Sequence, residues 1–294
     1  MYSIVALLTG VAVSLMVVAN GQLADQLNLY RATVLIHVIG LLVQSVIMVW
    51  RRTDMRLRRG LPLFGYMGGT LGVITVTFTM YAFAELGVAP VIALNLLGMT
   101  ATSILYDQFG WSGMRRYPFT RFKAVSLAVS TAGVIILLLP FSLASGLAVL
   151  LALLTGTSAV VSRTLNARLL GFYNLHLSTF FNYVTGLLTS VVLLALLEPE
   201  AFFSEFAFQS SNWFIYTGGA IGAMIVSLTS VIVVRLSSYH VTVLTFLGQY
   251  FFGLILDAIL GRMPTVQAVL GGMVVLAGLM VNTLEKPKAN KSGT

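Results

Sequence analysis

The chain has 294 residues, of which 58% are hydrophobic and only 9% are charged, and it contains no cysteine. A soluble domain carries about 25% charged residues, so this composition excludes a cytosolic enzyme, a secreted module and a nucleic-acid binder. A helix needs about 20 apolar residues to cross roughly 30 Å of bilayer hydrocarbon, and the length leaves room for about ten such helices. We therefore expect the net charge of +8 to come from basic residues that set the orientation of the chain in the membrane. The lack of cysteine also excludes disulfides and thiolate metal ligands.

Ten apolar stretches follow one another along the chain. They cover residues 4–22, 31–50, 62–85, 90–107, 121–140, 144–167, 173–197, 213–236, 239–260 and 264–284. Each is too long for a strand, and none shows the alternating segments of a membrane barrel. The first stretch has no basic residue before it, so we interpret it as a retained span and not as a cleaved signal peptide. The pattern predicts an all-α integral membrane protein with ten transmembrane helices.

Lysine and arginine concentrate in alternate connections. If the N-terminus lies in the cytoplasm, the cytoplasmic segments hold 15 of the 17 basic residues and leave only Arg31 and Arg262 outside. The connection at 198–205, which carries three glutamates, then also lies outside. Because basic residues favour the cytoplasmic face, the distribution predicts that both termini are cytoplasmic (N-in/C-in).

The two halves of the chain repeat each other. A shift of 146 residues matches Thr9-Gly10 with Thr155-Gly156, Asn20 with Asn166, Thr33 with Thr179 and Gly40 with Gly186. A shift of 150 matches Tyr66 with Tyr216, Gly68-Gly69 with Gly218-Gly219, Gly72 with Gly222, Thr79 with Thr229, Gly98 with Gly248 and Asp107 with Asp257. We place the first repeat at 1–142, the second at 143–285 and a cytoplasmic tail at 286–294. Five spans per repeat is an odd number, so the repeats are expected to be inverted, as in secondary transporters.

One set of motifs carries a family resemblance. It consists of Gly68-Gly69-x-x-Gly72, Leu86-Gly87, Asn95-x-x-Gly98, Tyr106-Asp107-Gln108-Phe109-Gly110 and Arg121. These residues resemble a repeat of the YdcZ-type branch of the drug/metabolite transporter superfamily, whose members share the ten-helix EamA-like fold. The second half keeps the double glycine, Gly248 and Asp257 but lacks the Phe-Gly pair and the arginine. The resemblance covers the chain to about residue 286 and implies an inner-membrane carrier whose cavity is lined by spans 1, 3, 4, 6, 8 and 9.

Polar side chains share faces on those same spans when positions are plotted at 100° per residue. The candidate substrate-binding residues are Asn20, Tyr66, Tyr81, Asn95, Arg163, Asn166, Tyr216 and Gln249. A purely structural role for these polar residues also remains open. Serine and threonine hydroxyls in spans usually bind the carbonyl of the preceding turn, asparagines can bridge helices, and Gly65-x-x-x-Gly69 and Gly218-x-x-x-Gly222 are typical of close helix packing.

Charged residues at membrane depth are few. Arg163 either faces the cavity or extends its side chain to the interface. Glu85 and Arg235 hold matched positions in the two repeats and are candidate gating residues or interface residues. Asp107 and Asp257 are expected to cap span ends. The three histidines share no spacing that indicates a metal site, and no acidic residue lies in the middle of a span, which argues against a proton-coupled cation antiporter.

These patterns predict a secondary transporter that works as an exporter of a small organic metabolite or drug, with an amino-acid-like substrate as one candidate. The motif G-x-x-x-x-G-K-[ST] is absent, so no ATP hydrolysis is expected. A membrane enzyme would need clustered His, Asp or Glu residues, and neither H-E-x-x-H nor paired carboxylates occur, so we expect no enzymatic activity and no cofactor. A channel and a lipid-translocating or accessory membrane subunit remain alternatives. The expected partners are a small-molecule substrate and membrane lipid, without nucleic acid, in a monomer or homodimer of the bacterial inner membrane.

Overall fold

The computed structural model describes residues 2–56, 62–109, 119–203, 210–233 and 238–281. Within these ranges the chain forms ten helices of 16 to 27 residues. They are α1 (Tyr2–Leu27), α2 (Leu29–Trp50), α3 (Gly68–Leu86), α4 (Val88–Phe109), α5 (Arg121–Leu138), α6 (Gly146–Phe172), α7 (Leu175–Leu197), α9 (Gly218–Val233), α10 (Ser238–Ile259) and α11 (Val266–Val281). Shorter elements are η1 (Leu63–Tyr66), η3 (Leu143–Ser145), α8 (Pro199–Phe203) and η4 (Trp213–Thr217). The expected helical positions are thus confirmed to within a few residues.

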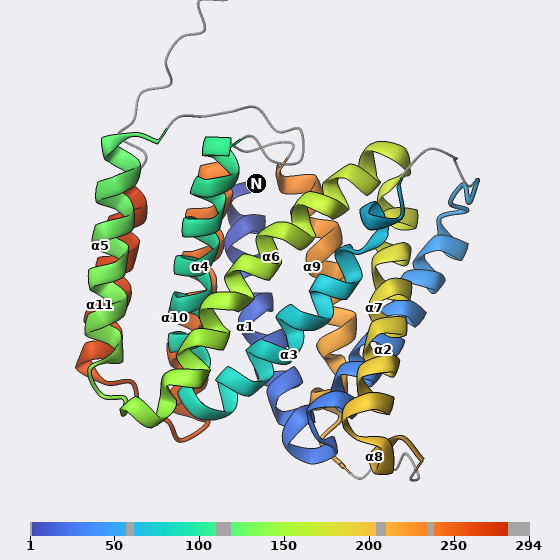
Figure 1. Cartoon of the computed structure of the whole chain (residues 1–294), viewed down its shortest axis with the longest axis horizontal. Helices are drawn as coiled ribbons and strands as arrows, with labels where there is room; N and C mark the ends of the chain where they lie inside the picture. The colour runs from blue at the N-terminus through green and yellow to red at the C-terminus, as the bar shows by residue number, and fades with distance from the viewer. Residues whose placement is uncertain (1, 57–61, 110–118, 204–209, 234–237, 282–294) are drawn as a thin grey trace, which may run out of the picture.

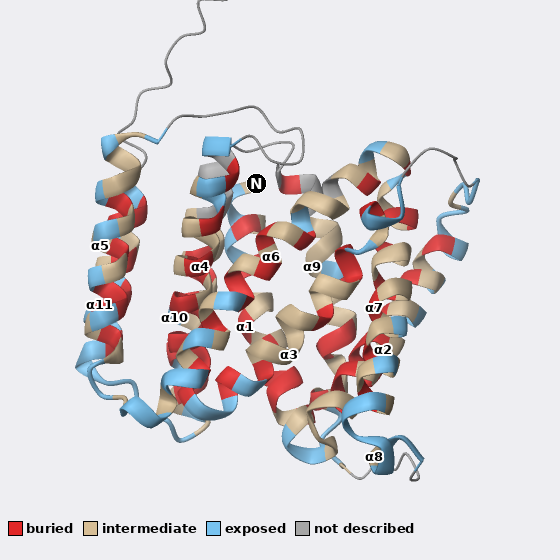
Figure 2. Cartoon of the chain, viewed as in Figure 1, coloured by how far each residue is buried: buried red, intermediate tan, exposed pale blue. Residues whose placement is uncertain are grey.

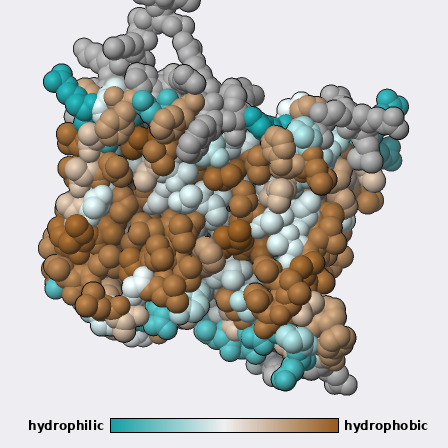
Figure 3. All heavy atoms as spheres, viewed as in Figure 1, coloured by the Kyte–Doolittle hydropathy of each residue, from teal (hydrophilic) through white to brown (hydrophobic). Residues whose placement is uncertain are grey.

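The helices suit a bilayer. Seven of them are long and apolar enough to cross a membrane, and three shorter apolar segments cover Trp213–Thr229, Val243–Ile259 and Val266–Val281. The surface across the middle of the molecule is strongly hydrophobic, while hydrophilic residues gather toward its two ends (Figure 3). Large apolar side chains such as Val46, Leu188 and Met273 are exposed on this surface, as expected where the solvent is lipid.

The chain runs up and down between two ends, and α11 finishes at the end where α1 begins (Figure 1). Helices at matched repeat positions run in opposite directions: α1 against α6, α3 against α9 and α5 against α11. We call the end where α1 begins the N-terminal end and the opposite one the far end. The two repeats are therefore inverted relative to each other.

The helix contacts obey the same two-fold relation. α1 packs on α10 as α6 packs on α4, and α2 packs on α9 as α7 packs on α3. Two further contacts, α2 with α7 and α5 with α11, join helices that are each other's equivalents. Buried residues line these contacts between the helices (Figure 2), while α5 and α11 form a pair at one edge of the molecule (Figure 1).

Glycines set the closest helix crossings, and they do so in matched pairs. A Cβ built on Gly69 would overlap the backbone of α7 at Asn182, and one on Gly219 would overlap α2 at Ile36, the equivalent residue. Gly10 and Gly156 face α10 and α4 in the same symmetric way. Close approach of helix backbones needs residues without side chains. The expectation that the double glycines pack against neighbouring helices is confirmed.

The two halves meet at an aromatic contact between α2 and α7. The rings of His37 and Tyr183 lie edge to face with centroids 6.0 Å apart. They occupy equivalent repeat positions, and each ring lies over a glycine of the other helix, Gly186 and Gly40 respectively. The Tyr183 hydroxyl also donates to the Gly219 carbonyl at 3.3 Å, which ties this centre to α9.

Candidate substrate pathway

Two of the predicted residues, Asn20 and Asn166, lie over the double glycines of the opposite repeat. The Asn20 amide oxygen faces Gly218 at the start of α9, and the Asn166 amide oxygen faces Gly68 at the start of α3. Both oxygens are buried, and neither has a hydrogen-bond partner among the described residues. Each asparagine therefore contacts the other half of the chain at a point where a 3₁₀ turn gives way to an α-helix.

Tyr66 and Tyr216 hold the 3₁₀ turns that precede those glycines. The Tyr66 hydroxyl lies 2.7 Å from that of Tyr173, and its ring packs edge to face on Phe181 with centroids 5.2 Å apart. The Tyr216 hydroxyl accepts a hydrogen bond from the backbone N–H of Ser210 at 3.4 Å. The structure thus groups Tyr66 near Asn166 and Tyr216 near Asn20, as two matched clusters at opposite ends of the bundle.

The seam between α3 and α6 is polar. The Thr75 and Ser158 hydroxyls lie 2.8 Å apart, and Ser162 donates to the Gly68 carbonyl at 2.7 Å. The equivalent seam between α1 and α9 holds Ala12, Met16 and Ile225 at the matched positions. At these three matched positions, hydroxyl groups occur only in the seam between α3 and α6.

Arg163 follows Ser162 on this seam and points away from the outer surface. On α6 it lies about 180° from Leu154 and about 160° from Leu147, two leucines exposed on the outside of the bundle. The Arg163 side chain is nevertheless exposed. Its equivalent on α1, Val17, is only 5% exposed.

A second matched pair gives the same asymmetry. A Cβ built on Gly72 of α3 would meet no atom within 4 Å, whereas one on Gly222 of α9 would meet the Tyr183 hydroxyl at 3.0 Å and the Met16 sulfur at 3.4 Å. In Figure 1, α3 begins and α6 ends at the N-terminal end, whereas α9 begins and α1 ends at the far end. Gly72 and Arg163 therefore lie in the halves of their helices nearer the N-terminal end, and Gly222 and Val17 in the halves nearer the far end. Of these matched positions, the two toward the N-terminal end are the less tightly packed.

Asn95 and Gln249 lie at helix crossings near the middle of the bundle. The Asn95 carbonyl faces Gly156 on α6, and its buried side-chain oxygen has no partner among the described residues. The Gln249 carbonyl accepts a hydrogen bond from the Ser14 hydroxyl on α1 at 2.6 Å, and its side chain is half-buried.

Tyr81 and the predicted gating residues are not brought into this group. Tyr81 and Glu85 are exposed on α3, each about 160° around the helix from the buried Phe83. The other polar residues on the Tyr81 side of α3 bind neighbouring helices: Thr70 lies 2.9 Å from Thr189 on α7. The side chain of Arg235 lies outside the described residues.

Two charged residues at the far end of the bundle join the repeats. Asp257 accepts hydrogen bonds from the backbone N–H groups of Val88 at 2.8 Å and Ala89 at 2.9 Å. It therefore caps a span end, as expected, but the end belongs to α4 of the other repeat. Arg262 donates to the carbonyls of Phe83 at 2.7 Å and Ala84 at 3.1 Å. In the sequence, the only signal for this role of Arg262 is that it is one of two basic residues expected outside.

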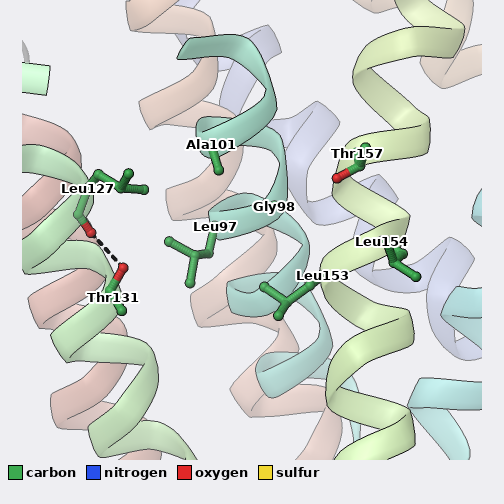
Figure 4. Close-up of a pocket in the computed structure, with 8 residues that line it drawn as sticks. All are labelled: Leu97, Gly98, Ala101, Leu127, Thr131, Leu153, Leu154 and Thr157. Carbon is green, nitrogen blue, oxygen red and sulfur yellow. Dashed lines mark hydrogen bonds between the residues drawn. The ribbon is translucent and has the colours of Figure 1, made fainter. Parts of the chain in front are cut away.

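Two surface hollows lie away from these residues. One, of about 380 Å³, is an apolar groove between α4, α5 and α6 (Figure 4); it is lined by Leu97, Gly98, Ala101, Leu127, Thr131, Leu153, Leu154 and Thr157. The Thr131 hydroxyl donates to the Leu127 carbonyl at 2.8 Å. The other hollow, of about 320 Å³, lies beside η1 and the end of α6. Within the described part of the chain, no group of three His, Asp or Glu side chains could hold a metal ion.

An inverted-repeat bundle of apolar helices is an architecture that many secondary transporters share. The family model described as "Putative inner membrane exporter, YdcZ" matches this sequence twice, over residues 1–136 and 147–281. The chain belongs to this family and thus to the multi-pass proteins of the inner membrane. A solved structure titled "Crystal structure of protein" is similar over 96% of this chain and 95% of its own, with 19% identity and a TM-score of 0.62, which shows a shared fold. No curated protein matches the sequence.

Proposed function

We propose that the chain is a secondary transporter that exports a small organic anion or zwitterion by alternating access. In this proposal all ten long helices cross the membrane, and both termini are cytoplasmic. Inverted repeats allow two packings of nearly equal free energy, each open to one side. The single observation that carries the proposal is the asymmetry of matched positions: Gly72 and Arg163 are open where Gly222 and Val17 are packed.

Arg163 is the proposed substrate-orienting residue. A guanidinium offers five fixed donors and suits a carboxylate. No hydrogen bond or ion pair joins Arg163 to another described residue, so its donors are available to a ligand in the open interior. The neighbouring Ser162 and Thr75 are already hydrogen-bonded within the seam. These bonds join α3 to α6 beside Arg163.

Matched arginine variants in proteoliposomes test this role. Export of radiolabelled zwitterionic, anionic and cationic amino acids and simple carboxylates is compared for the wild type, Arg163→Ala and Arg163→Lys. Arg168→Ala is the control, because Arg168 lies further along α6 with its guanidinium 5.9 Å from the Phe64 ring centre. We expect Arg163→Ala to abolish transport, Arg163→Lys to keep a fraction, and the control to transport normally. Normal transport by a folded Arg163→Ala protein would remove Arg163 and the anionic preference from the proposal.

A further inference from the structure

The far end of the interior is closed by a contact between α1 and α3. A Cβ built on Gly21 of α1 would overlap the ring of Phe83 on α3. The Phe83 side chain is 2% exposed, and Val17, one turn before Gly21, is 5% exposed. Phe83 therefore packs with Val17 in the buried core between α1 and α3, toward the far end.

Arg262 holds Phe83 in that place through both its backbone and its ring. The guanidinium donates to the Phe83 and Ala84 carbonyls at 2.7 and 3.1 Å, and its central carbon lies 5.0 Å from the centre of the Phe83 ring. The Phe83 carbonyl also accepts a hydrogen bond from the backbone N–H of Gly87 at 3.0 Å, and the carbonyls at the end of a helix attract cations. Arg262 lies between α10 and α11 in the second repeat, and Phe83 lies on α3 in the first. This contact therefore joins the two repeats.

Asp257 secures the same corner from its other side. Its carboxylate binds the first N–H groups of α4, and a Cβ on Gly87 would approach its Oδ1 to 2.8 Å. Gly87 has φ of 86° and turns the chain sharply between α3 and α4, a conformation that favours glycine. Asp257 and Arg262 thus fix both the end of α3 and the start of α4 to the second repeat.

The repeat does not duplicate this arrangement. The sequence positions that match Phe83 and Arg262 hold Val233 and Ser112, so neither the aromatic ring nor the arginine is present in the other half. Symmetry of the fold alone therefore does not require them. We therefore expect Phe83 and Arg262 to have a function that is specific to the far end of the bundle.

We propose that Phe83 and Gly21 form the gate on the outer side of the transporter, and that Arg262 is the latch that keeps this gate closed. The proposal rests on the alternating-access function above and adds the residues that control outward opening. In the outward-open state the Phe83 ring leaves Gly21 and Arg262 releases the two carbonyls. Loss of the latch shifts the population toward the outward-open state without removing any residue of the proposed substrate site.

Cysteine labelling tests the latch, because the natural chain has no cysteine. Val17→Cys places one thiol behind the gate, and a membrane-impermeant maleimide is applied to right-side-out and inside-out vesicles. Removing a charge-assisted hydrogen bond made in only one of two states shifts their ratio by roughly tenfold. We therefore expect Arg262→Ala to raise outside labelling of the thiol about tenfold, with a smaller rise for Arg262→Lys.

Arg31→Ala is the matched control. Arg31 also binds a backbone carbonyl, that of Ala201, but it lies on α2 away from Phe83, so its loss must leave labelling unchanged. Phe83→Ala is a second test that does not depend on Arg262, and it too should expose the thiol.

Unchanged outside labelling in folded Arg262→Ala and Phe83→Ala proteins overturns the gate. Labelling needs no substrate, so its outcome is separable from that of the transport assay. A labelling increase without measurable transport by any variant would retain the gate and remove the proposed function.

Discussion

Replacing Gly69 with alanine places a methyl group at the crossing of α3 and α7. The new Cβ would lie 2.6 Å from the backbone nitrogen of Gly186, and closer still to the Asn182 carbonyl and the Thr185 hydroxyl. Ordinary contact needs about 3.4 Å, so even the nitrogen must retreat by about 0.8 Å. Because two of these neighbours are backbone atoms of a helix, the helices must separate along the crossing.

Gly72→Ala is the matched comparison on the same helix. A Cβ there meets nothing within 4 Å, so this variant gains helix propensity of up to about 1 kcal/mol without a clash. Overpacking costs about 1–3 kcal/mol, and we expect the Gly69→Ala protein to be less stable than the Gly72→Ala protein by that amount. Gly219→Ala, the equivalent change at the α2–α9 crossing, should behave like Gly69→Ala.

Thermal unfolding in detergent, followed by intrinsic fluorescence, measures the difference. At roughly 2–4 °C per kcal/mol, the two crossing variants should melt several degrees below Gly72→Ala. Equal midpoints for all three variants would refute the reasoning, because they would show that the glycines do not sit at tight helix crossings in the membrane protein.

Three other outcomes are expected. A reporter that is active only in the cytoplasm should be active when fused after Thr294 and silent near Ser204; activity near Ser204 would contradict the inverted arrangement. Asp257→Ala should lower the free energy of unfolding by about 1–3 kcal/mol, because two buried N–H groups lose their acceptor. Asp257→Asn should retain part of this stability. Equal melting temperatures of the wild type and Asp257→Ala would refute the cap. Tyr66→Phe should cost about 0.5–1.5 kcal/mol, and adding Tyr173→Phe should cost little more, since both changes remove the same hydrogen bond; additive losses in a double-mutant cycle would show that the hydroxyls act separately.

The candidate site was only partly readable from the helical faces. Arg163 and Tyr81 are both polar residues of apolar helices, and nothing in the sequence separates them. In the structure, Ser162 beside Arg163 donates to the Gly68 carbonyl of α3, whereas Tyr81 is exposed about 160° around α3 from the buried Phe83. A helical wheel shows which residues share a face, and it does not show what that face meets.

By itself the sequence determined the membrane-spanning helical class, the repeat and the register between its halves. Hydrophobicity, segment length and residue identity are local properties, so they can be determined from the sequence without the three-dimensional structure. Only the tertiary structure decided that Asn20 meets Gly218 and Asn166 meets Gly68, and that Arg262 reaches across to Phe83. It alone also decided that Gly222 is packed where the matched Gly72 is not. The two packings of an inverted repeat share nearly the same contacts, and the choice between them depends on differences of a few kcal/mol summed over many helix contacts.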